Sequence, residues 1–573
     1  MSVRWKAPEN SRQRHVGLTI TLAVIIGLAG GLPILYLVIS SFDVSELGEP
    51  ARWGVDGWVN AFARDANWRS IVTTVGLSVR APIALIVSAM IAFWLVRADL
   101  PGRRFLEMLI WFGFLIPTVP MVMGWILLLD HNTGLLNRWI TGLGISDGPL
   151  FSIYSFSGIV WVHITATTVP FLVILLTPAF RQFDEALEDA GRVSGAGKFM
   201  VISKITLPLL LPAFVTAFVA TLIKSLETFE VEQIIGTPVG INVYANRIYD
   251  LMRFDPPLIA EAMALSTVFL VVLLVLLFVF RRTNASVLYS ATVGGKGPQS
   301  AVRRRTYGTY FAATLIYAYV GFTIFLPLAA LTAGTFTKLY GFFNLDDPWT
   351  INNWVTVLAD PRFLSATLSS LWIGVAVGCV GILLYTFIAW PLVRMNVGAK
   401  NLLNLMIWLP WAVPGLVLGN VLLVMFLEVP VLSPFYGTVI PLIIGLVIKE
   451  LPIGVQLIRV GLGQIKRELG EAGLVAGANQ VLIVRRIILP LIAPTLVAAF
   501  LLIFAASVRD ISTVVLLASP GTRTLSLLMF DFASSGELEA ASVVGLIVAM
   551  ICLAVTAIAF SISRKTGFGA TSR

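Results

Sequence analysis

Long apolar runs dominate the pattern of hydrophobic and polar positions along this chain. Residues 262–280, for example, contain no charged side chain. A helix needs about 20 predominantly apolar residues to cross the hydrocarbon core of a bilayer. Helices also satisfy their backbone polar groups internally, as lipid demands, and the runs lack the alternating pattern of an outer-membrane barrel. We therefore predict an all-α integral membrane protein.

Twelve such runs are separated by polar flanks, and their ends are defined to within a few residues. The first run is too long for the core of a signal peptide and is not followed by a small-residue cleavage site, so we expect it to remain as a helix. The predicted spans are 17–41, 70–96, 105–130, 152–178, 209–235, 258–281, 307–336, 364–393, 402–427, 434–458, 491–518 and 538–563.

Composition supports a chain that is solvated largely by lipid. Of the 573 residues, 57% are hydrophobic and 12% are charged, whereas a soluble domain is about 25% charged. The mean hydropathy is +0.90. The two cysteines, Cys379 and Cys552, lie within apolar runs and offer no disulfide framework. The three histidines are scattered, without metal-ligand spacing and without a neighbouring nucleophile. We expect no metal site, no cofactor bound by this chain and no catalytic residue.

The distribution of basic residues sets the expected orientation. Seven alternate segments, including both ends of the chain, hold 27 of the 40 Lys and Arg residues, and the loops on the other side hold nine. The side richer in Lys and Arg faces the cytoplasm, so both termini are predicted to be cytoplasmic. The net charge of +9 thus reflects insertion into the membrane, and we expect no nucleic-acid partner.

An internal repeat divides the chain into two units of the same orientation. Residues 187–212 and 469–494 are identical at eleven of 26 positions at an offset of 282, whereas an earlier block aligns at an offset of 297. The change of offset implies an insertion of about 15 residues between the two aligned blocks. We predict a first six-helix unit over 1–282, a flexible cytoplasmic linker over 283–305 and a second six-helix unit over 306–573. Parallel repeats are common in transporters and imply a pathway between the halves.

The repeated segments are long loops, each placed between the fourth and fifth spans of its half. A glycine in each, Gly195 and Gly477, is expected to divide the loop into two short helices. A proline in each, Pro208 and Pro490, suits the first turn of the following span. The remaining repeated positions combine an acidic residue with small residues that allow another surface to approach closely: Asp189, Ala190 and Gly191, then Glu471, Ala472 and Gly473.

This paired pattern resembles the Glu-Ala-Ala loop of binding-protein-dependent ABC importer permeases. Both copies have Gly at the third position, and the first has Asp189 where the family has Glu. The resemblance implies a type I permease fold in a bacterial inner membrane and two ATPase subunits, each receiving one loop as a coupling helix. It also implies a periplasmic binding protein that delivers a solute, with ATP bound and hydrolysed by the partner ATPase rather than by this chain.

Two other patterns were weighed. The segment 191–199 resembles a phosphate-binding loop, but Arg192 and Phe199 occupy positions that need Gly and Ser or Thr, and no strand precedes it. The segment 97–104 partly resembles a loop of major-facilitator carriers. A twelve-span secondary carrier and a membrane enzyme therefore remain the alternatives.

Ionisable residues inside predicted spans mark a candidate translocation path or gate. Each costs roughly 2.5–3.5 kcal/mol at the centre of a span, so it implies a task or a partner. At the 282 offset Glu227 aligns with Arg509, and we expect these two to meet at the interface between halves. Lys449 and Glu450 are interpreted as a further pair. A path function and a purely structural function remain equally open for the whole set: Glu227, Glu230, Arg509, Asp510, Lys449 and Glu450.

The substrate is indicated only by resemblance. The segments around 227–252 and 509–532 are similar to those of ferric-iron-type permeases, which are fused two-half chains. Relatives of the same architecture carry thiamine, polyamines or phosphonates, and these remain alternatives to iron.

Overall fold

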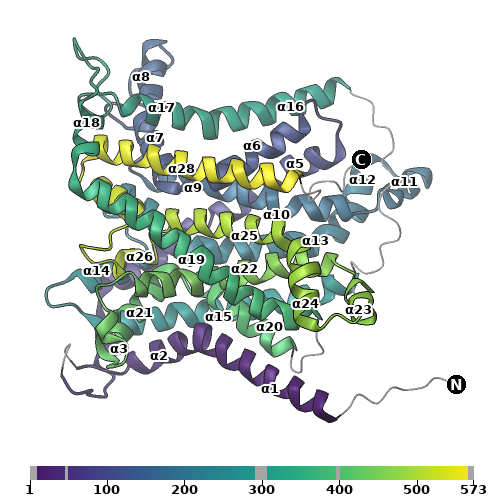
Figure 1. Cartoon of the computed structure of the whole chain (residues 1–573). Helices are drawn as coiled ribbons and strands as arrows, with labels where there is room; N and C mark the ends of the chain where they lie inside the picture. Colours follow the sequence, from purple (N-terminus) through teal and green to yellow (C-terminus); the bar gives the residue numbers. More distant parts are fainter. Residues whose placement is uncertain (1–8, 46–48, 291–305, 395–399, 467, 566–573) are drawn as a thin grey trace.

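A computed structural model describes residues 9–45, 49–290, 306–394, 400–466 and 468–565 as a bundle of helices lying side by side (Figure 1). Within these ranges there is no named strand, only two isolated bridges, between Asp43 and Trp53 and between Thr337 and Trp349. Most of the predicted linker, 291–305, lies outside the described residues.

The helices of the first predicted half begin and end as follows: α1 (Glu9–Ile26), α2 (Leu32–Ser40), α3 (Asp56–Ala63), α4 (Asp65–Leu77), α5 (Arg80–Arg97), α6 (Arg103–Leu115), α7 (Thr118–Leu129), α8 (Leu135–Gly142), α9 (Phe156–His163), α10 (Val169–Gln182), α11 (Ala186–Val193), α12 (Lys198–Val201), α13 (Leu207–Leu226), α14 (Tyr244–Arg253) and α15 (Ile259–Ser290).

Those of the second predicted half are α16 (Tyr307–Val320), α17 (Leu326–Gly334), α18 (Asn352–Ala359), α19 (Pro361–Arg394), α20 (Lys400–Trp408), α21 (Gly415–Glu428), α22 (Ile440–Gln464), α23 (Glu468–Val475), α24 (Gln480–Ile483), α25 (Leu489–Arg509), α26 (Val514–Leu517), α27 (Leu525–Ser534) and α28 (Leu538–Lys565).

Several of these helices are joined end to end by five-residue π-helical turns, each of which precedes a proline. The six turns in the described part of the chain are Gly27–Gly31, Ile164–Thr168, Ile202–Thr206, Glu232–Gly236, Gly321–Phe325 and Val484–Ile488. In every case a proline follows two positions after the turn ends. Proline has no N–H to donate and its ring collides with the carbonyl one turn earlier, and a wider turn relieves that clash without ending the helix.

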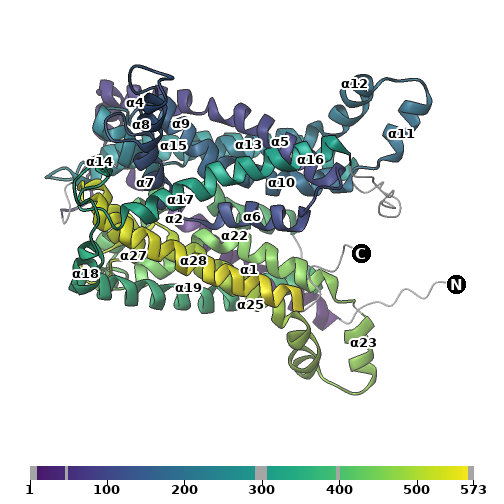
Figure 2. The same ribbon diagram turned by 90° about the horizontal axis from the view of Figure 1, so that it is seen from above.

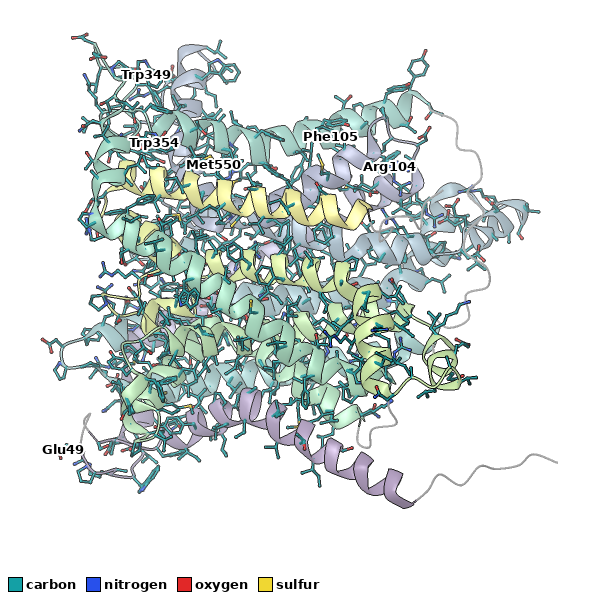
Figure 3. The ribbon with its side chains drawn as sticks, in the orientation of Figure 1. Glu49, Arg104, Phe105, Trp349, Trp354 and Met550 are labelled. Atoms are coloured by element: carbon teal, nitrogen blue, oxygen red, sulfur yellow. The ribbon has the colours of Figure 1, made fainter. Side chains whose placement is uncertain are left out.

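Ten of the described helical segments, counted across such joints, are long and apolar enough to cross a membrane, and they correspond to ten of the predicted spans. Side chains such as Phe105 and Met550 point outwards from the bundle and are about half exposed (Figure 3). Exposed apolar side chains on long helices are what a lipid solvent requires.

The predicted spans 105–130 and 402–427 are not straight helices. The pairs α6–α7 and α20–α21 bend by 96° and 93°, so the count of twelve spans holds only if each bent pair is one span. Pro117 and Pro414 lie at the two bends, and the residues before them are extended. Proline pushes the preceding residue out of the helical region.

The predicted fifth and eleventh spans also end earlier than expected. Hydropathy suggested helices to 235 and 518, but α13 ends at Leu226 and α25 ends at Arg509. Short, broken segments follow, and they contain three of the six candidate path residues, Glu227, Glu230 and Asp510.

The first helix of each predicted half packs against the other half. In the lower part of Figure 1, α1 and α2 lie along α20 and α21, and the Tyr36 hydroxyl donates to Glu428 at 2.6 Å. At the opposite side α17 packs on α7, and the Tyr340 hydroxyl donates to the carbonyl of Met123 at 2.9 Å. The two sequence repeats are therefore interlocked in space.

Candidate coupling loops and translocation path

The two repeated loops project from the same end of the helix bundle. Figure 2 shows α11 and α12 at one corner of that end and α23, with the loop that follows it, at another. Each loop consists of two short helices, as the sequence predicted, and Pro208 and Pro490 each lie in the first turn of the long helix that follows.

A left-handed glycine ends the first short helix of each loop. Gly195 and Gly477 both have a φ of 85°. In the first loop the amide of Ala196 donates to the carbonyl of Gly191, and the amide of Gly195 donates to that of Arg192, both at 3.0 Å. The second loop repeats both bonds at the same length. This is the Schellman arrangement, in which glycine avoids the steric cost of a positive φ.

The glycine at the third position of each motif, Gly191 or Gly473, lies close to an isoleucine side chain of the segment that follows it. A Cβ on Gly191 would come within 2.6 Å of Ile205, and one on Gly473 within 2.9 Å of Ile483. Real Cβ contacts are essentially never shorter than 3.0 Å. A larger residue at the third position of either motif would therefore have to push this isoleucine side chain aside.

The tips of both loops expose apolar side chains at equivalent positions. Val193 is 89% exposed and Val475 is 90% exposed. The acidic residues of the motif, Asp189 and Glu471, are exposed as well. Apolar side chains exposed at an end of the bundle, beside exposed acids, are typical of a surface that contacts another protein.

The two loops are attached to the bundle by different contacts, which sequence reasoning missed. Glu188 is buried and accepts from Arg97 at 3.4 Å and from the Thr206 hydroxyl at 2.8 Å. In the second half Arg394, the repeat equivalent of Arg97, donates to two carbonyls near the end of α22, at 2.9 Å each. The repeat aligns the arginines but gives no sign of their partners.

The candidate path residues lie on α22, at the end of α25 and in the segments that follow α13 and α25, but they do not form the expected pairs. Glu227 forms an ion pair with Lys224 at 2.7 Å. Arg509 donates to the carbonyl of Phe114 at 3.1 Å and lies over its ring. The expected contact between Glu227 and Arg509 is therefore not formed in this conformation, because each side chain has a nearer partner.

The expected pair of Lys449 and Glu450 is also replaced by another. Lys449 forms its ion pair with Asp510 and donates to the Ser512 hydroxyl at 3.1 Å. Asp510 also accepts from the amide of Thr513 at 2.8 Å. Adjacent residues of a helix point in different directions, so Lys449 pairs with Asp510 and not with its neighbour Glu450.

Two acids of the set, Glu230 and Glu450, are partly buried and form no ion pair within 4.0 Å with any residue that the structure describes. Glu230 and Glu450 each lie within electrostatic range of Lys449, Asp510 and Arg509. The structure thus brings these five residues into one region, to which both halves contribute. Within the described ranges no group of three or more His, Cys, Asp or Glu side chains is arranged to hold a metal ion.

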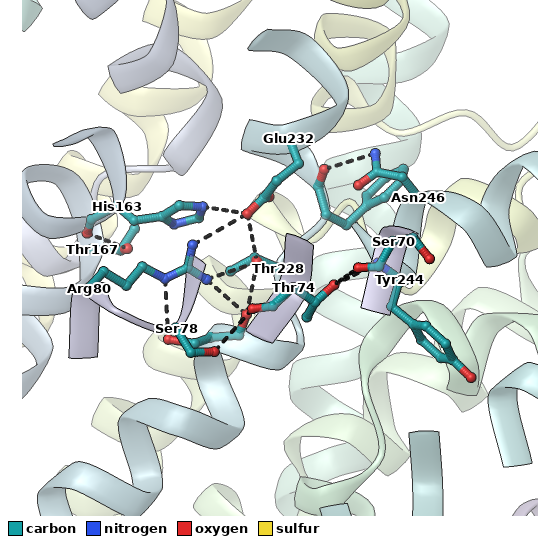
Figure 4. Close-up of polar contacts among 12 residues, drawn as sticks. Ser70, Thr74, Ser78, Arg80, His163, Thr167, Thr228, Glu232, Tyr244 and Asn246 are labelled. Atoms are coloured by element: carbon teal, nitrogen blue, oxygen red, sulfur yellow. Dashed lines mark hydrogen bonds and ion pairs between the residues drawn. The ribbon is translucent and has the colours of Figure 1, made fainter. Parts of the chain in front are cut away.

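A separate charged cluster, which the sequence analysis did not predict, holds the segment after α13 in place (Figure 4). Glu232 is fully buried, and one of its oxygens contacts Arg80 at 3.4 Å, His163 at 2.8 Å and the Thr228 hydroxyl at 2.8 Å. Arg80 also donates to the carbonyl of Ser225 at 2.8 Å. The cluster thus ties α5, α9 and the irregular segment together.

A cavity of about 390 Å³ lies between α20, α22 and α25 of the second half. Its lining is mostly apolar, and Gln456 and Thr495 are its polar side chains. Such a lining offers few of the oxygen ligands that a hard cation requires.

Comparison with known proteins agrees with this geometry. The family of binding-protein-dependent transport system inner membrane components matches residues 84–285 and 379–567, so the same family unit occurs twice. The chain belongs to this family, and it has the all-helical fold of a type I permease with two repeats.

Curated relatives include ferric transport permeases. The ferric transport system permease protein FbpB of Actinobacillus pleuropneumoniae is 26% identical over 77% of this chain and 63% of its own length. A putative ferric permease of Haemophilus influenzae is 26% identical over 71% of this chain and 64% of its own length. The chain thus spans less than two thirds of these two relatives. A second Fe(3+)-transport permease of H. influenzae is 23% identical over 91% of this chain and 93% of its length.

Among solved structures, a bacterial alginate ABC transporter in complex with a periplasmic protein aligns with 44% of this chain and 94% of its own. The identity is 20% and the TM-score is 0.37.

Proposed function

We propose that this chain is the membrane permease of an ATP-driven importer, in which two copies of a separate ATPase subunit dock on the two coupling loops. The observation that carries the proposal is the pair of equivalent projections at one end of the bundle, each with a left-handed glycine and a valine about 90% exposed. Family membership, with the family unit present twice, supports the same conclusion. ATP binding and hydrolysis are assigned to the partner.

The contacts of the loops suggest how ATPase movement reaches the membrane. Each loop continues through a π turn into α13 or α25, so displacement of a loop moves the helix that leads to the irregular charged segment. In the first half the Arg97–Glu188 contact adds a link to α5. We propose that ATPase closure moves the halves relative to one another and opens the path near Glu227, Glu230, Arg509, Asp510, Lys449 and Glu450.

We propose ferric iron, delivered by a periplasmic binding protein, as the solute. The support is the similarity to permeases named for ferric transport. Other relatives are named for 2-aminoethylphosphonate or for trehalose and maltose, so substrate identity requires a direct assay. Uptake of radioactive ferric iron into vesicles containing the full complex, tested for competition by thiamine, a polyamine and a phosphonate, would decide it. Absence of iron uptake, together with uptake of one of these organic solutes by the same vesicles, would refute the iron assignment.

The docking proposal is tested by placing charge at the loop tips. Val193→Asp and Val475→Asp together introduce acids into a surface that becomes desolvated on docking, where an unpaired charge costs several kcal/mol. We expect the ATPase activity of the purified complex to fall by at least about tenfold, equivalent to 1.4 kcal/mol. Val431→Asp is the matched control, because Val431 is also highly exposed (78%) but lies outside both loops. Equal activity of the double variant and the control would contradict docking at the loops.

Orientation is part of the same proposal. We propose that the coupling-loop end and both termini face the cytoplasm, on the distribution of Lys and Arg. A reporter that is active only in the cytoplasm, inserted after Gly197 in one chain and after Val431 in another, should be active only in the first. The reverse result would refute this orientation.

A further inference from the structure

One segment of the first half has no counterpart in the second. Between Leu129 of α7 and Phe156 of α9 lie 26 residues, whereas 11 residues separate Glu428 of α21 from Ile440 of α22. The difference of 15 residues matches the insertion that the change of repeat offset implies. Most of this longer connection is α8 and the loop 143–151, here called the inserted arm, and the proposed transport function assigns no task to it.

The inserted arm is held in a defined shape by one buried side chain. The Asn137 amide group donates to the carbonyls of Asp130 and Phe151, at 2.9 Å each. Its oxygen accepts from the amides of Leu150, at 3.1 Å, and Phe151, at 2.9 Å. Asn137 forms four hydrogen bonds that join the start of the arm to its end. The arm therefore has a defined conformation.

The outward surface of this arm is apolar. Five large hydrophobic side chains are exposed: Trp139 (65%), Leu143 (56%), Ile145 (67%), Leu150 (57%) and Phe151 (45%). Asp147 is the single ionisable residue between 139 and 151. An exposed apolar surface of this kind, with aromatic residues and little charge, is typical of a site that contacts a membrane or another protein.

The position of the arm indicates what covers it. Figure 1 shows α8 leaving the bundle sideways, across the direction of the long helices and close to the end opposite the coupling loops. In Figure 2, α8 appears towards one edge of the bundle and not over its middle. A protein delivering solute to the central path would sit over that end, whereas a sideways arm at this level meets the boundary of the bilayer.

We propose that the inserted arm is an interfacial membrane anchor, with its apolar surface in the boundary between lipid headgroups and acyl chains. Trp side chains are enriched at this depth. An amphipathic helix that lies in the interface buries its apolar face there without crossing the membrane. Exposed apolar side chains also lie on the long helices that are apolar enough to cross a membrane. The anchor belongs to the first half alone.

The test measures the surroundings of one position on the arm. The full chain carries Ile145→Cys, with Cys379 and Cys552 replaced by Ser, and an environment-sensitive fluorophore is attached to the new thiol. The chain is reconstituted in vesicles that contain lipids spin-labelled at the headgroup or deep in the acyl chain, and iodide serves as the aqueous quencher. Ser535→Cys is the water-exposed control at the same end of the bundle, and Leu383→Cys, 74% exposed along α19, is the lipid-facing control.

We expect headgroup-labelled lipid to quench the fluorophore at position 145 about threefold more strongly than at position 535, with iodide quenching reduced to a similar extent. Leu143→Cys should give the same result, so failure of one variant to fold leaves the test intact. Quenching by iodide alone would overturn the proposal. Iodide access that disappears when a purified binding protein is added would also overturn it and would assign the arm to a protein partner instead. Protection from every quencher, in the absence of any partner, would contradict it as well.

Discussion

The buried cluster around Glu232 allows a quantitative prediction. We expect its ion pair to hold the segment after α13 in place. Arg80 is 1% exposed and Glu232 is 0% exposed, so neither charge is solvated by water. Removing one partner of a buried ion pair costs about 3–5 kcal/mol, because the remaining charge is uncompensated. Arg80→Met also removes one of the two donors to the carbonyl of Ser225, the other being the Thr228 hydroxyl at 3.1 Å. We expect this variant to be less stable by about 4 kcal/mol.

The double variant Arg80→Met, Glu232→Met separates the charge effect from lost packing. With both charges removed no uncompensated ion remains, and an apolar replacement of a buried pair is often close to neutral. We expect a cost of about 2 kcal/mol or less for the double variant, so the two changes should be strongly non-additive. Lys338→Met is the matched control, because the Lys338–Asp347 pair is exposed and contributes no more than about 1 kcal/mol.

The chain contains its own reporter for the assay. Cys552 on α28 is 1% exposed, whereas Cys379 is exposed. With Cys379→Ser in every variant, a thiol-reactive dye should label Cys552 only when the bundle opens, during heating or titration with a denaturing detergent. If Arg80→Met behaves like Lys338→Met, or if the double variant is as unstable as the sum of the single variants, the cluster does not hold the segment as described.

Three further results are expected. Gly477→Ala should destabilise the second coupling loop by about 1–2 kcal/mol because its φ is positive, and hydrogen exchange over α23 and α24 should rise; unchanged exchange would contradict the cap. Lys449→Met should abolish transport while Lys449→Met with Asp510→Asn restores part of it, since the double variant leaves no unpaired charge; equal loss in both would assign a direct path function to Lys449. Tyr36→Phe, which removes the hydrogen bond to Glu428 between the interlocked halves, should cost about 1 kcal/mol in thermal unfolding, and a loss of several would imply a further function of that hydroxyl.

Hydropathy located the long helices well, because each span must be long and apolar enough to cross the lipid bilayer, and this depends only on its own residues. It misplaced the ends of the fifth and eleventh spans by nine residues, at Leu226 instead of 235 and Arg509 instead of 518. The residues beyond those ends are apolar enough to pass as span, but they pack in irregular segments fixed by charged partners. Hydropathy also could not give the sharp bends at Pro117 and Pro414, because a proline can kink a helix or end it.

The coupling loops were predictable in the same local sense. Gly195 and Gly477 end short helices in the left-handed conformation that glycine adopts without steric cost, and Pro208 and Pro490 start the following helices. These helix ends and starts depend only on a few neighbouring residues. A repeated motif is therefore enough to predict them.

Partners distant in the sequence were decided only by the folded chain. Arg80 meets Glu232 across 152 residues and Lys449 meets Asp510 across 61, whereas the symmetric alignment had suggested Glu227 with Arg509. The first helix of each repeat packs on the other repeat, which no alignment of the repeats indicates. Composition and periodicity thus predict which segments face lipid, where a helix ends and which buried charges require a counter-charge. They do not predict which distant residue provides that counter-charge, because this depends on how the helices pack against one another in the whole bundle.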